Sequence, residues 1–169
     1  SYVIVGIFFF KTRLKKLSVI MILLGLGTAL LHGTLRFYGQ WLDEISMLIL
    51  SFYIIKEVRW LRFKKTTNEL YLFPLILPYF VLQKYFSYFF VIFTTLQIYT
   101  YKIAQKDYKK CSKREYCLIR TYSIILIFST FCWFLDQVFC DYVRVFQLHA
   151  VWHAGTALSL LLGLWAIII

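Results

Sequence analysis

The chain has 169 residues, of which 61% are hydrophobic and 16% are charged. Soluble domains carry about 25% charged residues, so this composition excludes a soluble globular domain and indicates a membrane protein. The formal net charge is +11 at pH 7. We attribute that charge to membrane orientation and contact with anionic lipids, and not to nucleic-acid binding.

Seven apolar segments follow one another along the chain. A helix needs about 20 apolar residues to cross about 30 Å of hydrocarbon. We predict membrane helices over residues 2–10, 18–36, 41–59, 69–82, 86–104, 118–138 and 149–168. The expected fold is all-α, a polytopic bundle of seven transmembrane helices that forms a single transmembrane domain over residues 1–169.

The first segment, YVIVGIFFF, is too short to cross a bilayer. Because the chain begins at Ser1 and not at a methionine, we expect this segment to be the end of a truncated helix whose N-terminal part is missing. A cleaved signal peptide is the alternative, but its positive region should precede the apolar run, whereas KTRLKK follows it.

Residues 70–104 could form one long helix, but Pro74, Pro78 and the central Lys84 favour two helices joined by a tight turn. The positive charges support that choice. With seven spans, the loops after the first, third and fifth hold all of the 19 Lys and Arg residues except Arg36, Lys84 and Arg144. By the positive-inside rule the N-terminus is then expected on the lumenal side and the C-terminus in the cytosol.

The three histidines fall at a similar predicted depth. His32 lies about 14 residues into the second span, or about 21 Å from the cytosolic side. His149 and His153 lie in the first two turns of the seventh span, one turn apart on the same face. Two such imidazoles can hold Zn²⁺, and a third completes a site with one open position. The alternatives are hydrogen-bonded histidines within the bundle, or haem held by two facing histidines.

Asp43 follows His32 across a turn expected around Gly39. A carboxylate near a zinc-bound water would accept its proton. Alternatively, Asp43 and Glu44 favour the start of a helix through the helix macrodipole, and both roles are compatible. Glu44 and Arg36 are interpreted as interfacial residues.

Thr28 lies one turn before His32 on the same helix face, where a hydroxyl by default bonds the carbonyl four residues earlier. Asp136 lies well inside an apolar sequence. It is expected either to orient a zinc-binding histidine as a hydrogen-bond acceptor or to face Arg36 or Arg144.

Four stretches, TALLHGTL, GQWLDEI, FLDQVFCD and QLHAVWH, resemble the alkaline ceramidase family in order and spacing. The resemblance runs from about Lys11 to the end of the chain. It implies an intramembrane zinc amidase of the endoplasmic reticulum or Golgi that hydrolyses ceramide to sphingosine, or another sphingoid base, and a free fatty acid. It also implies His32, His149 and His153 as zinc ligands and Asp43 as the acid acting on the zinc-bound water.

The sequence departs from the family pattern at two places. The family's serine, which helps to stabilise the oxyanion, falls on Thr28. The family's acidic calcium-binding segment would precede Ser1, so Ca²⁺ is expected only through that missing segment and no residue of this sequence is assigned to it. The alternative function is a receptor of the adiponectin or progestin type, from the same superfamily, with a structural zinc site. The sequence predicts no protein partner.

Overall fold

The computed structural model describes residues 1–105 and 112–169, and no strand occurs among them. This confirms the all-α fold. The chain divides into two compact units, Tyr2–Lys106 and Asp107–Ile169, here called the N-terminal and the C-terminal unit. Of the basic loop predicted after the fifth span, Lys106, Lys109 and Lys110 lie outside the described residues.

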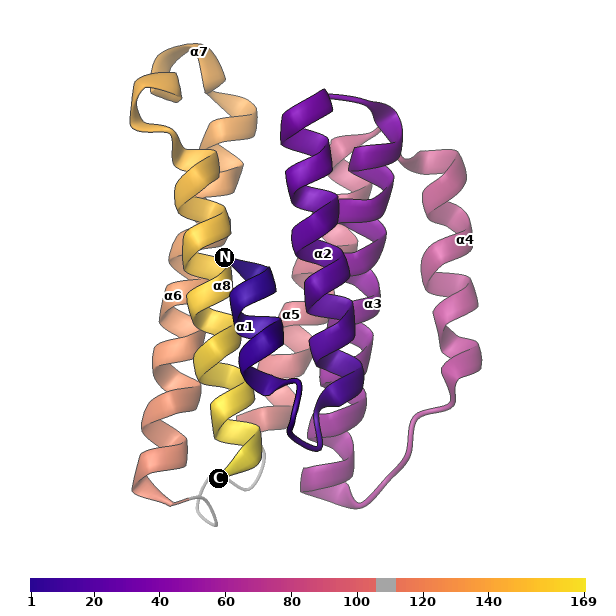
Figure 1. Cartoon of the computed structure of the whole chain (residues 1–169), viewed down its shortest axis with the longest axis vertical. Helices are drawn as coiled ribbons and strands as arrows, with labels where there is room; N and C mark the ends of the chain where they lie inside the picture. Colours follow the sequence, from indigo (N-terminus) through magenta and orange to yellow (C-terminus); the bar gives the residue numbers. More distant parts are fainter. Residues whose placement is uncertain (106–111) are drawn as a thin grey trace. The chain divides into compact units, whose positions relative to one another are not determined.

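Helices occupy all seven predicted spans (Figure 1). The N-terminal unit contains α1 (Tyr2–Phe9), α2 (Lys15–Thr34), α3 (Phe37–Phe63), the 3₁₀ turn η1 (Glu69–Tyr71), α4 (Leu72–Leu82) and α5 (Phe86–Gln105). The C-terminal unit contains α6 (Lys113–Val138), α7 (Cys140–Val143), the 3₁₀ turn η3 (Arg144–Phe146) and α8 (Leu148–Ile168).

The helices α2, α6 and α8, with 20, 26 and 21 residues, are each long and apolar enough to cross a membrane. They correspond to three of the predicted spans. For the helices of the other four spans, a membrane crossing stays a prediction. The predicted separation of the fourth and fifth spans is confirmed, because α4 ends at Leu82 and α5 begins at Phe86.

Small residues bring the helices of the N-terminal unit together. A Cβ atom placed on Gly6 of α1 would lie 2.8 Å from the Ser18 carbonyl oxygen of α2. A Cβ atom on Gly25 of α2 would lie 2.6 Å from the side chain of Val3. In membranes the hydrophobic effect does not drive helices together, so helices associate through this kind of close backbone packing at small residues. The glycines therefore hold α1 against α2.

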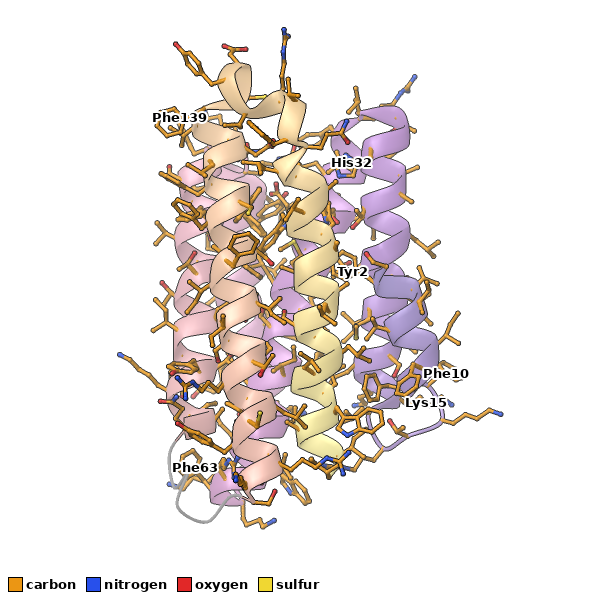
Figure 2. The ribbon with its side chains drawn as sticks, turned by 90° about the vertical axis from the view of Figure 1, so that its left-hand side faces the viewer. Tyr2, Phe10, Lys15, His32, Phe63 and Phe139 are labelled. Carbon is orange, nitrogen blue, oxygen red and sulfur yellow. The ribbon has the colours of Figure 1, made fainter. Side chains whose placement is uncertain are left out.

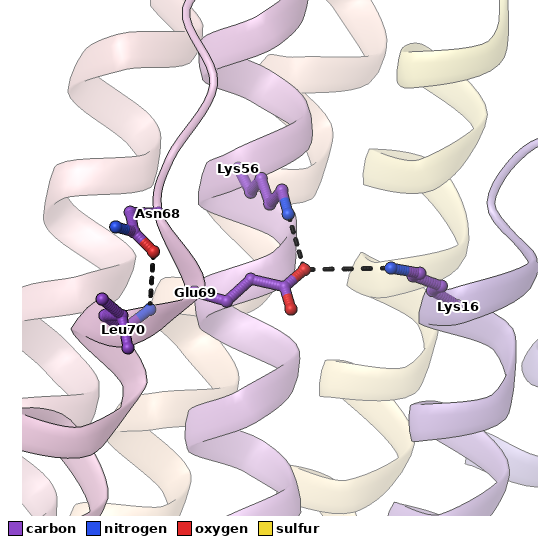
Figure 3. A network of polar contacts seen from close by, with 5 residues as sticks. All are labelled: Lys16, Lys56, Asn68, Glu69 and Leu70. Atoms are coloured by element: carbon purple, nitrogen blue, oxygen red, sulfur yellow. Dashed lines mark hydrogen bonds and ion pairs between the residues drawn. The ribbon is translucent and has the colours of Figure 1, made fainter.

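The carboxylate of Glu69 forms ion pairs with one lysine of α2 and one lysine of α3. Glu69 Oε1 lies 2.7 Å from Lys56 Nζ of α3 and 3.8 Å from Lys16 Nζ of α2 (Figure 3). The Asn68 side chain caps η1 by accepting a hydrogen bond from the Leu70 nitrogen, at 3.0 Å. Glu69 thereby fixes the entry into α4 at the basic end of the unit.

The C-terminal unit is built on the antiparallel pair α6 and α8. Trp133 of α6 stacks on Trp152 of α8, with ring centroids 4.9 Å apart. One turn further along, Gly155 packs so closely on α6 that a Cβ atom there would lie 2.0 Å from Ser129 Oγ. These contacts fix the register of the pair and place Asp136 opposite the start of α8.

Candidate functional site

A glycine on α2 allows the start of α3 to lie directly against it. A Cβ atom on Gly27 would lie 2.8 Å from the backbone nitrogen of Asp43 and 2.9 Å from the carbonyl carbon of Leu42. Any larger residue would push the two backbones apart. The sequence therefore brings the residue after Gly27, which is Thr28, to the level of Asp43.

Gly39 does not form the turn between the second and third spans, so that prediction is wrong. The turn lies at Leu35 and Arg36, and Leu35 adopts the left-handed conformation with φ 52°. Gly39 belongs to the first turn of α3, where a Cβ atom would lie 2.7 Å from the Leu31 Cα atom. The glycine is needed for close packing on α2 and not for backbone freedom.

Thr28 and Asp43 form the polar contact of this helix pair. The Thr28 hydroxyl donates to Asp43 Oδ1, and its oxygen also lies 2.9 Å from the Leu24 carbonyl oxygen. The default bond expected for Thr28 is thus present, with a carboxylate in addition. Since a hydroxyl has one proton, its two acceptors compete for it. Asp43 is only 6% exposed, so its carboxylate is buried. The Thr28 hydroxyl is a hydrogen-bond donor to this buried carboxylate.

Asp43 does not start its helix. Because α3 begins at Phe37, no acidic residue lies in its first turn, and the macrodipole role considered for Asp43 and Glu44 is wrong. If α3 crosses the membrane as the sequence predicts, a buried carboxylate in its second turn is costly, which favours a functional role.

His32 lies in the last turn of α2, one turn beyond Thr28 and therefore on the same face. Its side chain is exposed. Figure 2 shows His32 at one end of the N-terminal unit, with Lys15 and Phe63 at the other end. The imidazole is therefore displaced along α2 from the basic end, in the direction that the sequence predicts.

Sequence reasoning missed the surroundings of Glu44. This residue is half-buried; it accepts a hydrogen bond at 2.7 Å from the hydroxyl of Tyr79 in α4 and another at 2.9 Å from Gln40 Nε2. Glu44 therefore has two hydrogen-bond partners that the sequence did not predict, while its interfacial depth stays a prediction. The available signal was Tyr79 itself, a single phenol within the apolar run LFPLILPYF.

In the C-terminal unit, the first turns of α8 place His149 and His153 side by side. Their ring centroids are 4.7 Å apart, and Asp136 Oδ2 of α6 lies 3.3 Å from His149 Nδ1. Of the partners considered for Asp136, the structure places the histidine against it. A carboxylate on Nδ1 favours the tautomer whose Nε2 carries a free lone pair, which is the form that binds metals. The imidazoles of His149 and His153 are donors of the kind that zinc prefers.

Comparison with known proteins decides the family. A family model described as Ceramidase matches residues 9–169. The chain belongs to the ceramidase family. This finding confirms the resemblance that the four sequence stretches indicated, and membership of the ceramidase family is consistent with a metal.

The chain is also similar to a curated protein. An alkaline ceramidase of Arabidopsis thaliana is 28% identical over 160 residues, which cover 85% of this chain and 60% of that protein. The chain thus spans about 60% of the length of the curated relative it matches. No solved structure matches the chain significantly.

Proposed function

We propose that this protein hydrolyses the amide bond of ceramide within the membrane and releases a sphingoid base and a free fatty acid. The match to the ceramidase family over residues 9–169 supports the reaction. The observation that carries the proposal is the buried Asp43 carboxylate, hydrogen-bonded to Thr28 on the face of α2 that bears His32.

We further propose that His32, His149 and His153 together hold one zinc ion. The similar predicted depth of the three histidines supports this, as does the pairing of His149 with His153 and of His149 with Asp136 in the C-terminal unit. Zinc held by three imidazoles polarises a carbonyl and lowers the pKa of a bound water to about 7.

The residues of the chain then move one proton. Asp43 accepts it from the attacking water while the water oxygen bonds to the amide carbon. Once Asp43 is protonated, its own O–H group can donate to Thr28 Oγ1, which frees the Thr28 hydroxyl to donate to the developing oxyanion. Asp43 finally returns the proton to the leaving nitrogen as the C–N bond breaks. The balance is one amide and one water converted to one carboxylic acid and one amine.

We also propose a location in the membrane of the endoplasmic reticulum or Golgi, with the N-terminus lumenal and the C-terminus cytosolic. Three helices that are apolar enough to cross a membrane support the membrane location. The distribution of Lys and Arg over the loops supports the orientation.

The reaction is tested with the purified intact protein and ceramide, by measuring released sphingoid base. Asp43→Asn keeps an oxygen that accepts from Thr28 but removes the base, so turnover should fall by about 10²- to 10⁴-fold while bound metal is retained. Asp141→Asn, at an exposed carboxylate in α7, is the matched control and should be fully active. Unchanged turnover of Asp43→Asn would overturn its role as the base. Lipid binding by the wild type without hydrolysis would favour the receptor alternative.

A further inference from the structure

A second polar pair of the N-terminal unit has no part in the proposed mechanism. The Tyr79 hydroxyl of α4 donates to Glu44 Oε2 at 2.7 Å, and Gln40 Nε2 donates to the other carboxylate oxygen at 2.9 Å. Glu44 is the residue directly after Asp43. The pair therefore lies at the same level of α3 as the proposed catalytic base.

The Tyr79 ring is fully enclosed. Its exposure is 0%, and the ring of Phe89 from α5 meets it edge-on, with centroids 6.4 Å apart. Phe89 in turn stacks on Phe93. A ring packed this way has little freedom to turn, and a buried phenol left without an acceptor is destabilising. Tyr79 is thus a rigid donor aimed at one carboxylate.

The two carboxylates tie α3 to two different helices. Successive residues of a helix point about 100° apart around its axis. Asp43 is bound by Thr28 of α2 on one side of α3, and Glu44 is bound by Tyr79 of α4 on another. A rotation of α3 that weakened one bond would also strain the other.

We infer that Tyr79 is a positioning residue for Asp43, acting through its hydrogen bond to Glu44. The bond fixes the rotation of α3 about its axis, and that rotation sets the direction of the Asp43 carboxylate. The inference rests on the proposed function, in which Asp43 is the base. A small misplacement of a catalytic group is enough to slow turnover by up to about 100-fold.

Tyr79→Phe removes the hydroxyl and keeps the ring. In the intact protein, kcat for ceramide should fall by about 10- to 100-fold with KM nearly unchanged, because the change acts on the base and not on lipid binding. Trp41→Phe is the control, since it removes another hydrogen bond that links α3 to the α4 segment, the one of 2.7 Å from Trp41 Nε1 to Oε1 of Gln83, the residue directly after α4. Its kcat should stay within about twofold of the wild type. An equal fall of kcat in both variants would mean that any loss of contact between α3 and α4 is harmful, and would overturn the inference.

Two substitutions of Glu44 separate geometry from charge. Glu44→Gln keeps an oxygen that accepts from Tyr79, so kcat should remain close to the wild-type value. Glu44→Leu removes the acceptor and should lower kcat as Tyr79→Phe does. If Glu44→Gln is as slow as Glu44→Leu, the charge matters and the positioning role is wrong. This pair of variants also decides the matter if Tyr79→Phe fails to fold.

The test separates this inference from the proposed function. If the wild type hydrolyses ceramide and Asp43→Asn does not, the proposed function is supported. If Tyr79→Phe then keeps its full kcat, only the positioning role of Tyr79 is contradicted. An intact wild type that hydrolyses no ceramide would overturn both.

Discussion

At the scale of single residues, Thr28 differs by one methyl group from the serine that the sequence resemblance implies at this position. Its hydroxyl meets both Asp43 and the Leu24 carbonyl. Thr28→Ser keeps the hydroxyl and should retain turnover, whereas Thr28→Val keeps the shape and should lower kcat by about 10²-fold through loss of an oxyanion donor. Ceramide hydrolysis measures both. Thr130→Val is the control, because Thr130 makes a similar bond of 2.8 Å to the carbonyl four residues earlier. Full activity of Thr28→Val would contradict the role of the hydroxyl.

Asp136 is expected to act on metal affinity and not on the proton transfer. Removing the carboxylate that lies 3.3 Å from His149 Nδ1 leaves the imidazole without its orienting partner. Asp136→Ala should weaken zinc binding by about 10- to 100-fold. Competition with a chelator of known affinity measures this, with Asp141→Ala as the control. Equal zinc affinity in the two variants would rule out the role of Asp136.

The sequence could predict only those residue pairs whose members lie close together in the sequence, on one helix. The two histidines of α8 share a face because they are four residues apart, and their pairing follows from helix geometry alone. The bond between Tyr79 and Glu44 joins residues 35 positions apart in two helices. No periodicity in the sequence specifies which helices meet, so this bond could be found only in the structure.

At the scale of helices, the contact between α2 and α3 depends on Gly27. Gly27→Ala would place a Cβ atom 2.8 Å from the Asp43 nitrogen, so the helices must separate. We expect a loss of about 1–3 kcal/mol in the free energy of unfolding. Turnover should fall with it, because Thr28 and Asp43 move apart.

Gly33 offers the matched control on the same helix. A Cβ atom there meets nothing within 4 Å. Gly33→Ala should be neutral or stabilise the protein by up to about 1 kcal/mol, since alanine favours helices. Unfolding in detergent, followed by circular dichroism, compares the two variants. Similar stabilities would contradict the account of this helix contact.

The apolar runs of the sequence predict which segments are helical, but they do not predict where each helix begins and ends. The sequence places the start of the third span at residue 41, while α3 begins at Phe37. The reason is that the sequence predicts the turn at Gly39, whereas it is Leu35 that adopts the left-handed conformation that ends α2. The short helix α7 was not predicted, because four residues are too few to show a period.

At the scale of the whole molecule, the positive residues predict how the chain lies in the membrane. Cys117 in α6 and Cys140 in α7 are both exposed, and they fall on opposite sides of the predicted sixth span. Single-cysteine variants, with the other cysteines changed to serine, can be treated with an impermeant maleimide in sealed vesicles whose cytosolic face is outward. Cys117 should be labelled in intact vesicles and Cys140 only after permeabilisation. The reverse pattern would contradict the proposed orientation.

The central proposal is that His32, His149 and His153 bind one catalytic zinc ion. The most direct measurement is the zinc content of the purified intact protein and of the variants His32→Ala, His149→Ala and His153→Ala, together with their ceramide turnover. We predict one zinc per chain in the wild type, and loss of both zinc and turnover in each variant. Retention of zinc and turnover by His32→Ala would contradict the claim, because α8 alone would then hold the metal.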